Sequence, residues 1–237
     1  MDTVPARRSS RRPEITSGGA GSRPHRDPAG YDLISGPAVH TATATVGAMT
    51  SAVRPSPARD RLLRTASSLF YAEGLRGVGV DRVIAEAAVT RATFYRHFPG
   101  KEALVVAYLE RVDAAVRERA GALPEDAAGA AAWLLALTEA VGDQVCGAGF
   151  RGCAFINAAA EYPDPDSPVR RAVLVHREWL LAEVTAAFRS AGHPDPEEAA
   201  RRWMVLRDGA MVAGYLADPA PARATLTAGV RDLLATR

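Results

Sequence analysis

The chain has 237 residues, of which 48% are apolar and 24% charged, an ordinary composition for one large or two small globular domains. Residues 1–56 and 57–104 each carry a net charge of +3 and residues 105–237 carry −4, which suggests an anionic partner at the front of the chain only. The chain has no run of 18 apolar residues, which argues against a membrane-spanning helix, and no apolar segment after its N-terminal arginines, which argues against a secretory signal. Its two cysteines are too few for a disulfide framework. We expect a cytoplasmic protein without a membrane partner.

Residues 1–55 hold Gly, Pro, Ser, Thr and Arg in mixed order with few large apolar side chains, which predicts a disordered N-terminal extension. The segment from Met49 reads like an ordinary protein start. We therefore expect residues 1–48 to be an upstream extension, whose translation N-terminal sequencing of the native protein would test. A basic arm on DNA phosphates is the alternative interpretation of these residues.

From Ser56 onward, apolar residues recur at helical spacing and no segment alternates with the period of a strand, so the predicted fold class is all-α. Capping signals indicate where helices begin: Ser56-Pro57 and Ser167-Pro168 place a hydroxyl before proline, and Asp195-Pro196 resembles a capping box. The expected helices are 57–73, 80–87, 91–98, 101–121, 124–142, 153–161, 169–190, 196–216 and 223–235.

Residues 56–103 predict a DNA-binding domain. Two short helices joined by the tight turn Ala88-Val89, after a longer helix, form a helix-turn-helix arrangement. The second short helix opens with small or reaching side chains, which allow its end to approach base edges, and it continues with hydroxyl, guanidinium and imidazole donors. Lys101, the chain's only lysine, opens the next helix, where it could hold a phosphate. The candidate DNA-binding residues are Gly79, Thr90, Arg91, Ala92, Thr93, Tyr95, Arg96, His97 and Lys101.

The run from Val80 to Leu104, with Thr-Phe-Tyr-Arg-His-Phe followed by Lys-Glu-Ala-Leu, resembles the DNA-binding segment of the TetR/AcrR family of transcriptional regulators. Phe70 and Gly74 extend the similarity to about residues 59–108. The resemblance implies that residues 90–93 read bases and cap the recognition helix. It also implies that Tyr95, His97 and Lys101 contact phosphates, and that Phe94 and Phe98 lock the three helices together.

Two positions depart from the family pattern. Ala88 stands where the family usually has glycine, and alanine costs about 1 kcal/mol there if the position needs a positive φ. Gly79 stands where a hydroxyl cap is common, and glycine caps a helix less strongly.

Residues 104–237 are expected to form a helical domain that binds an effector and dimerises, as the resemblance implies. Asn157 and Glu161 share one helix face, and an amide in so apolar a helix needs a partner, either backbone or ligand. Aromatic residues at helical spacing are more often core than pocket, so both interpretations stay open. The candidate pocket residues are Trp133, Phe150, Phe155, Asn157, Glu161, His176 and Trp179.

The two C-terminal helices carry apolar stripes with small residues, which would allow close approach across a two-fold axis. The alternative is that these stripes face only their own core. The candidate dimer-interface residues are Trp203, Ala210, Met211, Gly214, Leu226, Val230 and Leu233.

Cys146 and Cys153 flank a glycine-rich segment. They either form a reversible, oxidant-sensing disulfide or are two inert thiols. No set of residues has metal-site spacing, so neither a metal nor another cofactor is expected.

The sequence therefore predicts a ligand-responsive transcriptional regulator, most often a repressor in this family, which binds a pseudo-palindromic double-stranded operator as a homodimer and responds to a small apolar effector. The alternative is a DNA-binding protein without an effector that acts through a protein partner. An enzyme is not expected, because the sequence shows no nucleophile–base set, no phosphate-binding loop after a strand and no paired-carboxylate motif.

Overall fold

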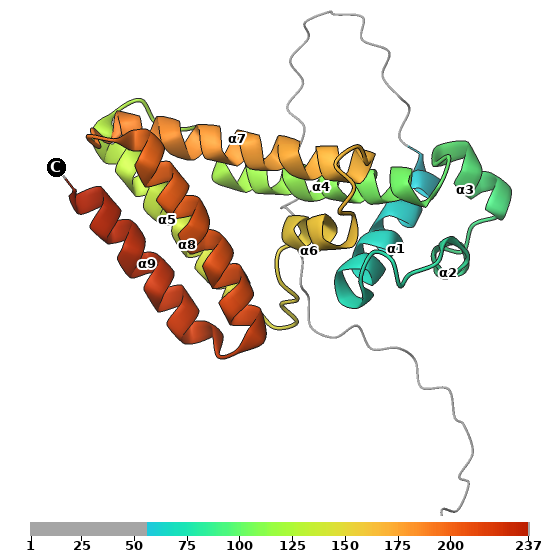
Figure 1. The fold of residues 1–237 in the computed structure, drawn as a ribbon. Coiled ribbons are helices and arrows are strands. Elements are labelled where there is room, and N and C mark those ends of the chain that lie inside the picture. Colours follow the sequence, from blue (N-terminus) through green and yellow to red (C-terminus); the bar gives the residue numbers. More distant parts are fainter. Residues whose placement is uncertain (1–55, 237) are drawn as a thin grey trace, which may run out of the picture. The chain divides into compact units, whose positions relative to one another are not determined.

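The computed structural model describes residues 56–236, and within this range nine helices follow one another without a strand. The all-α fold class is therefore confirmed for this range (Figure 1). The predicted N-terminal extension, residues 1–55, lies outside the described residues, as does Arg237. The helices are α1 (Pro57–Glu73), α2 (Val80–Glu86), α3 (Arg91–His97), α4 (Lys101–Ala120), α5 (Ala127–Cys146), α6 (Ala154–Glu161), α7 (Pro168–Ser190), α8 (Pro196–Leu216) and α9 (Pro219–Ala235). In the described part of the chain, no helix combines the length and the apolar character that crossing a membrane requires.

Side-chain caps set the beginnings of α1, α7 and α8 as the sequence predicts. Ser56 Oγ accepts from the Arg59 amide before α1, and Ser167 Oγ accepts from the Val169 amide before α7. Asp195 does the same for the Glu198 amide before α8. Each cap satisfies an amide that has no partner inside its helix.

Two helices differ from their predicted bounds by three or more residues at one or both ends. Helix α5 begins at Ala127 rather than at Pro124, because Asp126 caps it by accepting from the Gly129 amide at 2.8 Å. It continues past Gly142, where the missing side chain leaves room for Arg223. Helix α9 begins at Pro219, four residues before the predicted start, because Asp218 caps it in the manner of Asp195.

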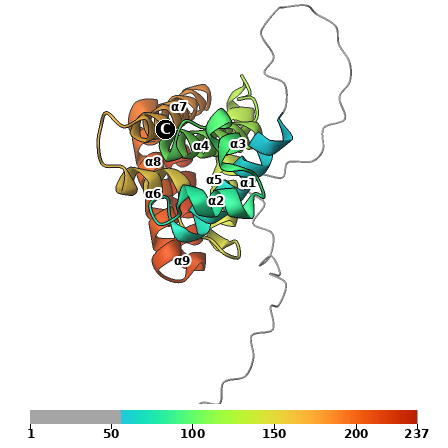
Figure 2. The same ribbon diagram turned by 90° about the vertical axis from the view of Figure 1, so that its right-hand side faces the viewer.

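The reading head, which we define as residues 56–103, is built around Phe94 of α3 and Phe98, the residue that follows this helix. Phe94 and Phe98 are both buried, with ring centroids 5.9 Å apart, and they belong to one core with Leu62 of α1 and Val83 of α2. Figure 2 looks onto this end of the described chain, where α2 and α3 lie in front of the other helices. The predicted packing role of the two aromatics is confirmed.

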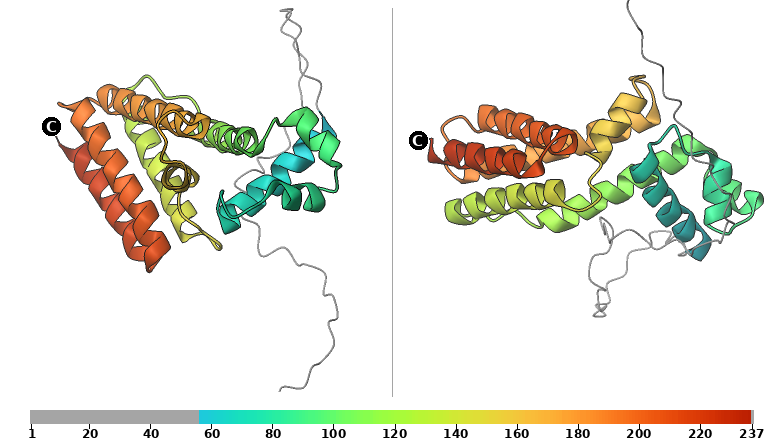
Figure 3. Two further views of the ribbon diagram at one scale, coloured as in Figure 1. Left: turned by 45° about the vertical axis from the view of Figure 1, so that its right-hand side comes forward. Right: turned by 90° about the horizontal axis from the view of Figure 1, so that it is seen from below.

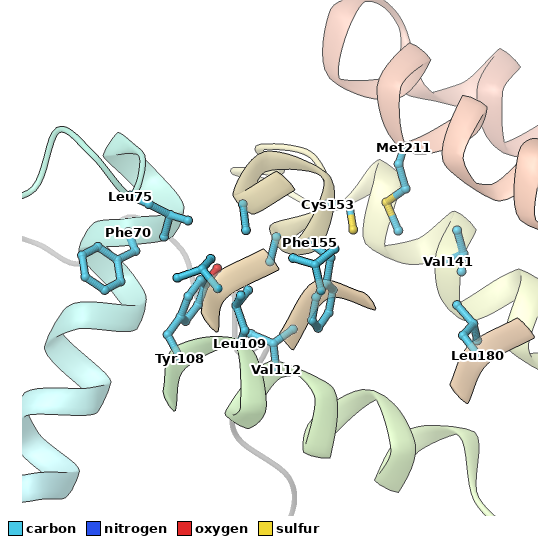
Figure 4. Packing of buried hydrophobic residues seen from close by; sticks show 14 of the residues in the cluster. Phe70, Leu75, Tyr108, Leu109, Val112, Val141, Cys153, Phe155, Leu180 and Met211 are labelled. Atoms are coloured by element: carbon cyan, nitrogen blue, oxygen red, sulfur yellow. The ribbon is translucent and has the colours of Figure 1, made fainter. Parts of the chain in front are cut away.

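The body, which we define as residues 104–236, continues the same core. Helix α9 packs against α5 and α8, while α7 packs against α4, α6 and α8 (Figures 1 and 3). Figure 4 shows buried side chains from α1 (Phe70), α4 (Tyr108), α6 (Phe155) and α8 (Met211), all members of this one cluster. Helix α4 therefore contributes side chains to both halves of the core.

The residues predicted to form a dimer interface are turned into this core. Trp203, Met211, Leu226 and Val230 are almost fully buried within the chain, and Gly214 lies against Val145. The stripes thus face their own core, which is the alternative interpretation given above. The part of α8 that faces outward carries other residues, namely Val205, Gly209, Val212, Ala213 and Leu216.

Candidate nucleic-acid interface

Helix α3 begins with a tight hydroxyl cap. Thr90 Oγ1 accepts from the Thr93 amide at 3.1 Å and lies 2.9 Å from Thr93 Oγ1. The Thr90 hydroxyl therefore serves the predicted capping role, and both threonines sit at the leading edge of the helix.

The outward face of α3 carries Arg91, Ala92, Tyr95 and Arg96, all exposed. Tyr95 is 50% exposed, and its ring meets the buried Phe94 ring edge-on at 5.1 Å. Arg91 Nη2 pairs with Asp81 Oδ1 of α2 at 2.5 Å, and both side chains are well exposed. A small residue between an arginine and a tyrosine at one helix end is a surface that can approach base edges and phosphates.

The candidate DNA-binding residues His97 and Lys101, at the margins of this face, already have hydrogen-bond partners within the chain. His97 Nε2 lies 3.2 Å from Ser56 Oγ, and Lys101 Nζ donates to the Arg76 carbonyl at 2.9 Å. Burial lowers the pKa of the Lys101 ammonium below its ordinary value, although the nearby Glu161 carboxylate partly offsets this shift. Gly79 is exposed and caps α2 without any side-chain hydrogen bond.

The turn between α2 and α3 contains a strained residue. Ala88 has a φ of +50°, and it is the only non-glycine residue in the described chain with a positive φ. This is the position where the family usually has glycine. Its positive φ makes alanine costly here, as the sequence predicts for a backbone of this conformation.

A joint between α6 and the loop after α1 uses two of the predicted pocket residues. Glu161 accepts from the Leu75 amide at 2.9 Å and from the Arg76 amide at 2.6 Å, and its carboxylate packs on Gly74, whose φ is +90°. Asn157 Nδ2 donates to the Arg151 carbonyl, so its partner is backbone. Both residues line a cavity of about 190 Å³ between α1 and α6. The joint therefore ties the body to the segment that leads into α2.

A second cavity, of about 160 Å³, lies inside the body between α4, α5, α7 and α8. Most of its walls are apolar, and Trp133 is the one predicted pocket residue among them. The lining residues are Val116, Arg119, Ala120, Trp133, Ala136, Leu137, Ala140, Val141, Gln144, Leu180, Trp203 and Arg207.

The other predicted pocket residues line neither of these two cavities. The His176 ring stacks on Phe155 at 3.6 Å between centroids, and it lies 5.9 Å from Trp179. His176 Nδ1 is 2.6 Å from Asp113 Oδ1. Burial lowers the pKa of His176, and the hydrogen bond to Asp113 opposes this shift without reversing it. Phe150 is partly buried against the core. The seven candidates are thus divided between two cavities, a packed stack and the edge of the core, where Phe150 lies.

Arg207 of α8 is a candidate that the sequence analysis missed. It is only 8% exposed; its Nη1 donates to Asp208 at 2.8 Å and its Nη2 to Cys153 Sγ at 3.3 Å, whereas its buried Nε has no acceptor. Burial opposes the charge, but Cys153 and Asp208 raise the pKa of Arg207 above its ordinary value. A charged residue between Trp203 and Met211 on an apolar stripe is the signal that could have identified it.

The two cysteines are free thiols, with Cys146 exposed and Cys153 buried. Within residues 56–236, no three His, Cys, Asp or Glu side chains lie together in a way that could hold a metal ion.

Comparison with known proteins identifies the family of this chain. Residues 62–108 match the family described as bacterial regulatory proteins, tetR family. The transcriptional repressor NemR of Escherichia coli K12 is 32% identical over 134 residues, which cover 56% of this chain and 67% of NemR. Among solved structures, the TetR-family regulator SCO4454 of Streptomyces coelicolor has 49% identity and a TM-score of 0.71 over 76% of this chain and 89% of its own. The reduced form of E. coli NemR has 25% identity and a TM-score of 0.68 over 77% of this chain and all of its own. The chain therefore belongs to the TetR family of helix-turn-helix transcriptional regulators.

Proposed function

We propose that this regulator is a repressor that binds a pseudo-palindromic operator as a homodimer and leaves it when a small ligand enters the body cavity. The observation that carries the proposal is the outward face of α3, where Arg91, Tyr95 and Arg96 are exposed on a helix whose other face is locked by Phe94. In this proposal the reading head, residues 56–103, is the DNA-binding domain, and the body binds effector and partner subunit.

Contact with DNA changes the surroundings of Arg91. Its guanidinium can donate two hydrogen bonds to a guanine in the major groove, but it must first leave Asp81. An exposed ion pair of this kind is worth about 0.2–1 kcal/mol, so a base contact compensates for its loss. In this proposal Tyr95 and Arg96 supply phosphate contacts.

The outward face of α8 supports dimerisation. Val205, Val212 and Leu216 are 72%, 45% and 75% exposed, and Gly209 and Ala213 separate them at helical spacing. Next to it, the exposed face of α9 carries the small residues Ala224, Ala228 and Ala235. An apolar face on α8 beside small residues of α9 fits a second copy across a two-fold axis.

Helix α4 supports coupling between ligand and DNA. Its 20 residues span about 30 Å. The N-terminal part packs in the core of the reading head through Leu104, while Val116 and Ala120 line the body cavity. A ligand that displaces the C-terminal half of α4 therefore moves the reading head, and a shift of a few ångströms breaks the match to successive major grooves, about 34–36 Å apart.

An alternative function, regulation by a protein partner, is favoured by exposed apolar residues on α7, namely Leu174, Val175 and Leu181. The two functions differ in one observable. Purified protein alone releases DNA on addition of a small molecule under the first proposal, and does so only with a second protein under the alternative.

The test is selection of bound duplexes from a random DNA pool at low salt. We expect an enriched sequence with two symmetric half-sites one helical turn apart. On that sequence, Arg91→Ala should relax discrimination at one base pair by about 1–3 kcal/mol, whereas Tyr95→Phe should weaken binding to all variants equally. Arg189→Ala, an exposed arginine near the end of α7, is the control. Failure to enrich any sequence would overturn the proposal.

A further inference from the structure

The mostly apolar body cavity carries positive charge in its lining. Its charged lining residues are Arg119 at the margin and the buried Arg207, and none of its lining residues is acidic. Resting on the ligand response proposed above, we propose that this cavity takes a small organic carboxylate of about one ring, whose anionic end binds Arg207.

The first support is an unsatisfied donor. Arg207 uses Nη1 for Asp208 and Nη2 for Cys153, and its Nε is buried without an acceptor. A buried guanidinium donor without a partner is costly, and the protein side chains around it provide none. A carboxylate bound against Arg207, which lines the cavity, would supply an acceptor to this guanidinium through a charge-assisted hydrogen bond.

The second support is the charge balance around Arg207. Asp208 is shared between Arg207 and Arg177, with Arg177 Nη2 at 2.8 Å from Asp208 Oδ2. Next to this group, Asp113 forms ion-pair contacts with both Arg117 and His176. Three guanidiniums therefore face two carboxylates, and His176 is kept neutral by its burial at neutral pH. One ligand carboxylate would balance the group.

The third support is the size and lining of the cavity. Its volume is about 160 Å³, and an apolar cavity of roughly 150 Å³ in another protein holds one benzene molecule. Trp133, Trp203 and Leu180 offer flat and branched apolar surfaces to such a ring. A fused polycyclic ligand is too large, a cation would be repelled by Arg207, and a neutral ring would leave the Nε donor unsatisfied.

Titration calorimetry on the full chain at pH 7 tests this assignment with three probes of one size, namely benzoate, benzamide and benzylamine. We expect benzoate to bind at least about tenfold more tightly than neutral benzamide, and benzylamine to give no heat. Arg207→Gln should reduce the preference for benzoate over benzamide to about one. Arg201→Gln, an exposed arginine of the same helix, should leave it unchanged.

A second variant covers the case in which Arg207→Gln fails to fold, as judged by circular dichroism. Ala140→Phe fills the cavity and leaves Arg207 in place, so it should abolish benzoate binding. Equal binding of benzamide and benzoate, absence of benzoate binding, or full binding by Ala140→Phe would each overturn the assignment.

Gel shifts on the selected operator separate this inference from the proposed function. If benzamide binds as well as benzoate and releases DNA, the carboxylate assignment fails while the ligand-responsive repressor stands. If the ligand-free protein binds no duplex, the repressor proposal fails, whereas tight benzoate binding that depends on Arg207 still supports a carboxylate site.

Discussion

At the scale of single residues, the reading head contains one conformational cost that a single substitution should remove. Ala88 adopts a φ of +50°, a region that favours glycine because a Cβ crowds the backbone there. Ala88→Gly should raise the free energy of unfolding by about 0.5–1 kcal/mol, less than the full strain because glycine loses more chain entropy on folding. Urea denaturation of the full chain measures this.

The matched control for Ala88→Gly is Ala85→Gly, an exposed alanine within α2. That substitution should lower stability by about 1 kcal/mol, because glycine is unfavourable in a right-handed helix. Equal effects of the two substitutions would mean that the φ of Ala88 has no energetic consequence.

His176 should make stability depend on pH. Burial lowers its pKa in the folded protein, so between that value and about 6.5 the unfolded chain binds more protons. The free energy of unfolding should therefore be largest above pH 6.5 and fall toward pH 5, with a slope approaching about 1.4 kcal/mol per pH unit. The charged neighbours that the ring faces are Asp113, Arg117 and Arg207.

Denaturation curves between pH 5 and pH 7 measure this slope. His176→Gln should reduce it, because the amide does not titrate. An unchanged slope in His176→Gln would contradict the assignment.

At the scale of elements, the contact between α6 and the loop after α1 is a joint made by one carboxylate. Glu161 accepts from two consecutive amides, Leu75 and Arg76, and this loop leads directly into α2. Glu161→Gln leaves only one oxygen acceptor and removes the charge, so we expect a loss of about 1–2 kcal/mol in stability. Amide hydrogen exchange of residues 74–80 should become faster. Glu178→Gln, an exposed glutamate of α7, should change neither.

Helix boundaries could be predicted where the cap is local. The starts of α1, α7 and α8 follow from Ser56, Ser167 and Asp195, since each cap needs only the next few residues. The end of α5 could not be predicted, because Gly142 stays helical to make room for Arg223 of another helix. The start of α9 was readable from Asp218-Pro219, which repeats the signal recognised at Asp195-Pro196.

At the scale of the whole molecule, the outward face of α8 predicts the quaternary structure. Val212→Glu places a charge in the proposed interface and should give a monomer in sedimentation equilibrium. The monomer should bind a single half-site as before but lose most affinity for the complete operator. Val175→Glu, which changes a similarly exposed residue on α7, should remain dimeric. The opposite pattern would assign the interface to α7.

The two sites differ in how far the sequence could reveal them. The α3 face comes from one continuous segment, so local spacing sufficed to select Arg91, Tyr95 and Arg96. The body cavity is assembled from four helices that are far apart in the chain, and only their packing decides which side chains meet there. For this reason Trp133 is the one predicted pocket residue that lines this cavity, Arg207 lines it without having been predicted, and Phe155 packs against His176 instead.

The bond from Lys101 to the Arg76 carbonyl has a practical consequence. Because no other side chain in the 237 residues bears an ε-amine, an acylating dye directed at lysine can label only this one side chain, at the start of α4, besides the α-amine of the chain. Its lowered pKa leaves a larger neutral, nucleophilic fraction at mildly alkaline pH. A fluorophore attached there would report operator arrival and departure in real time from a single defined position.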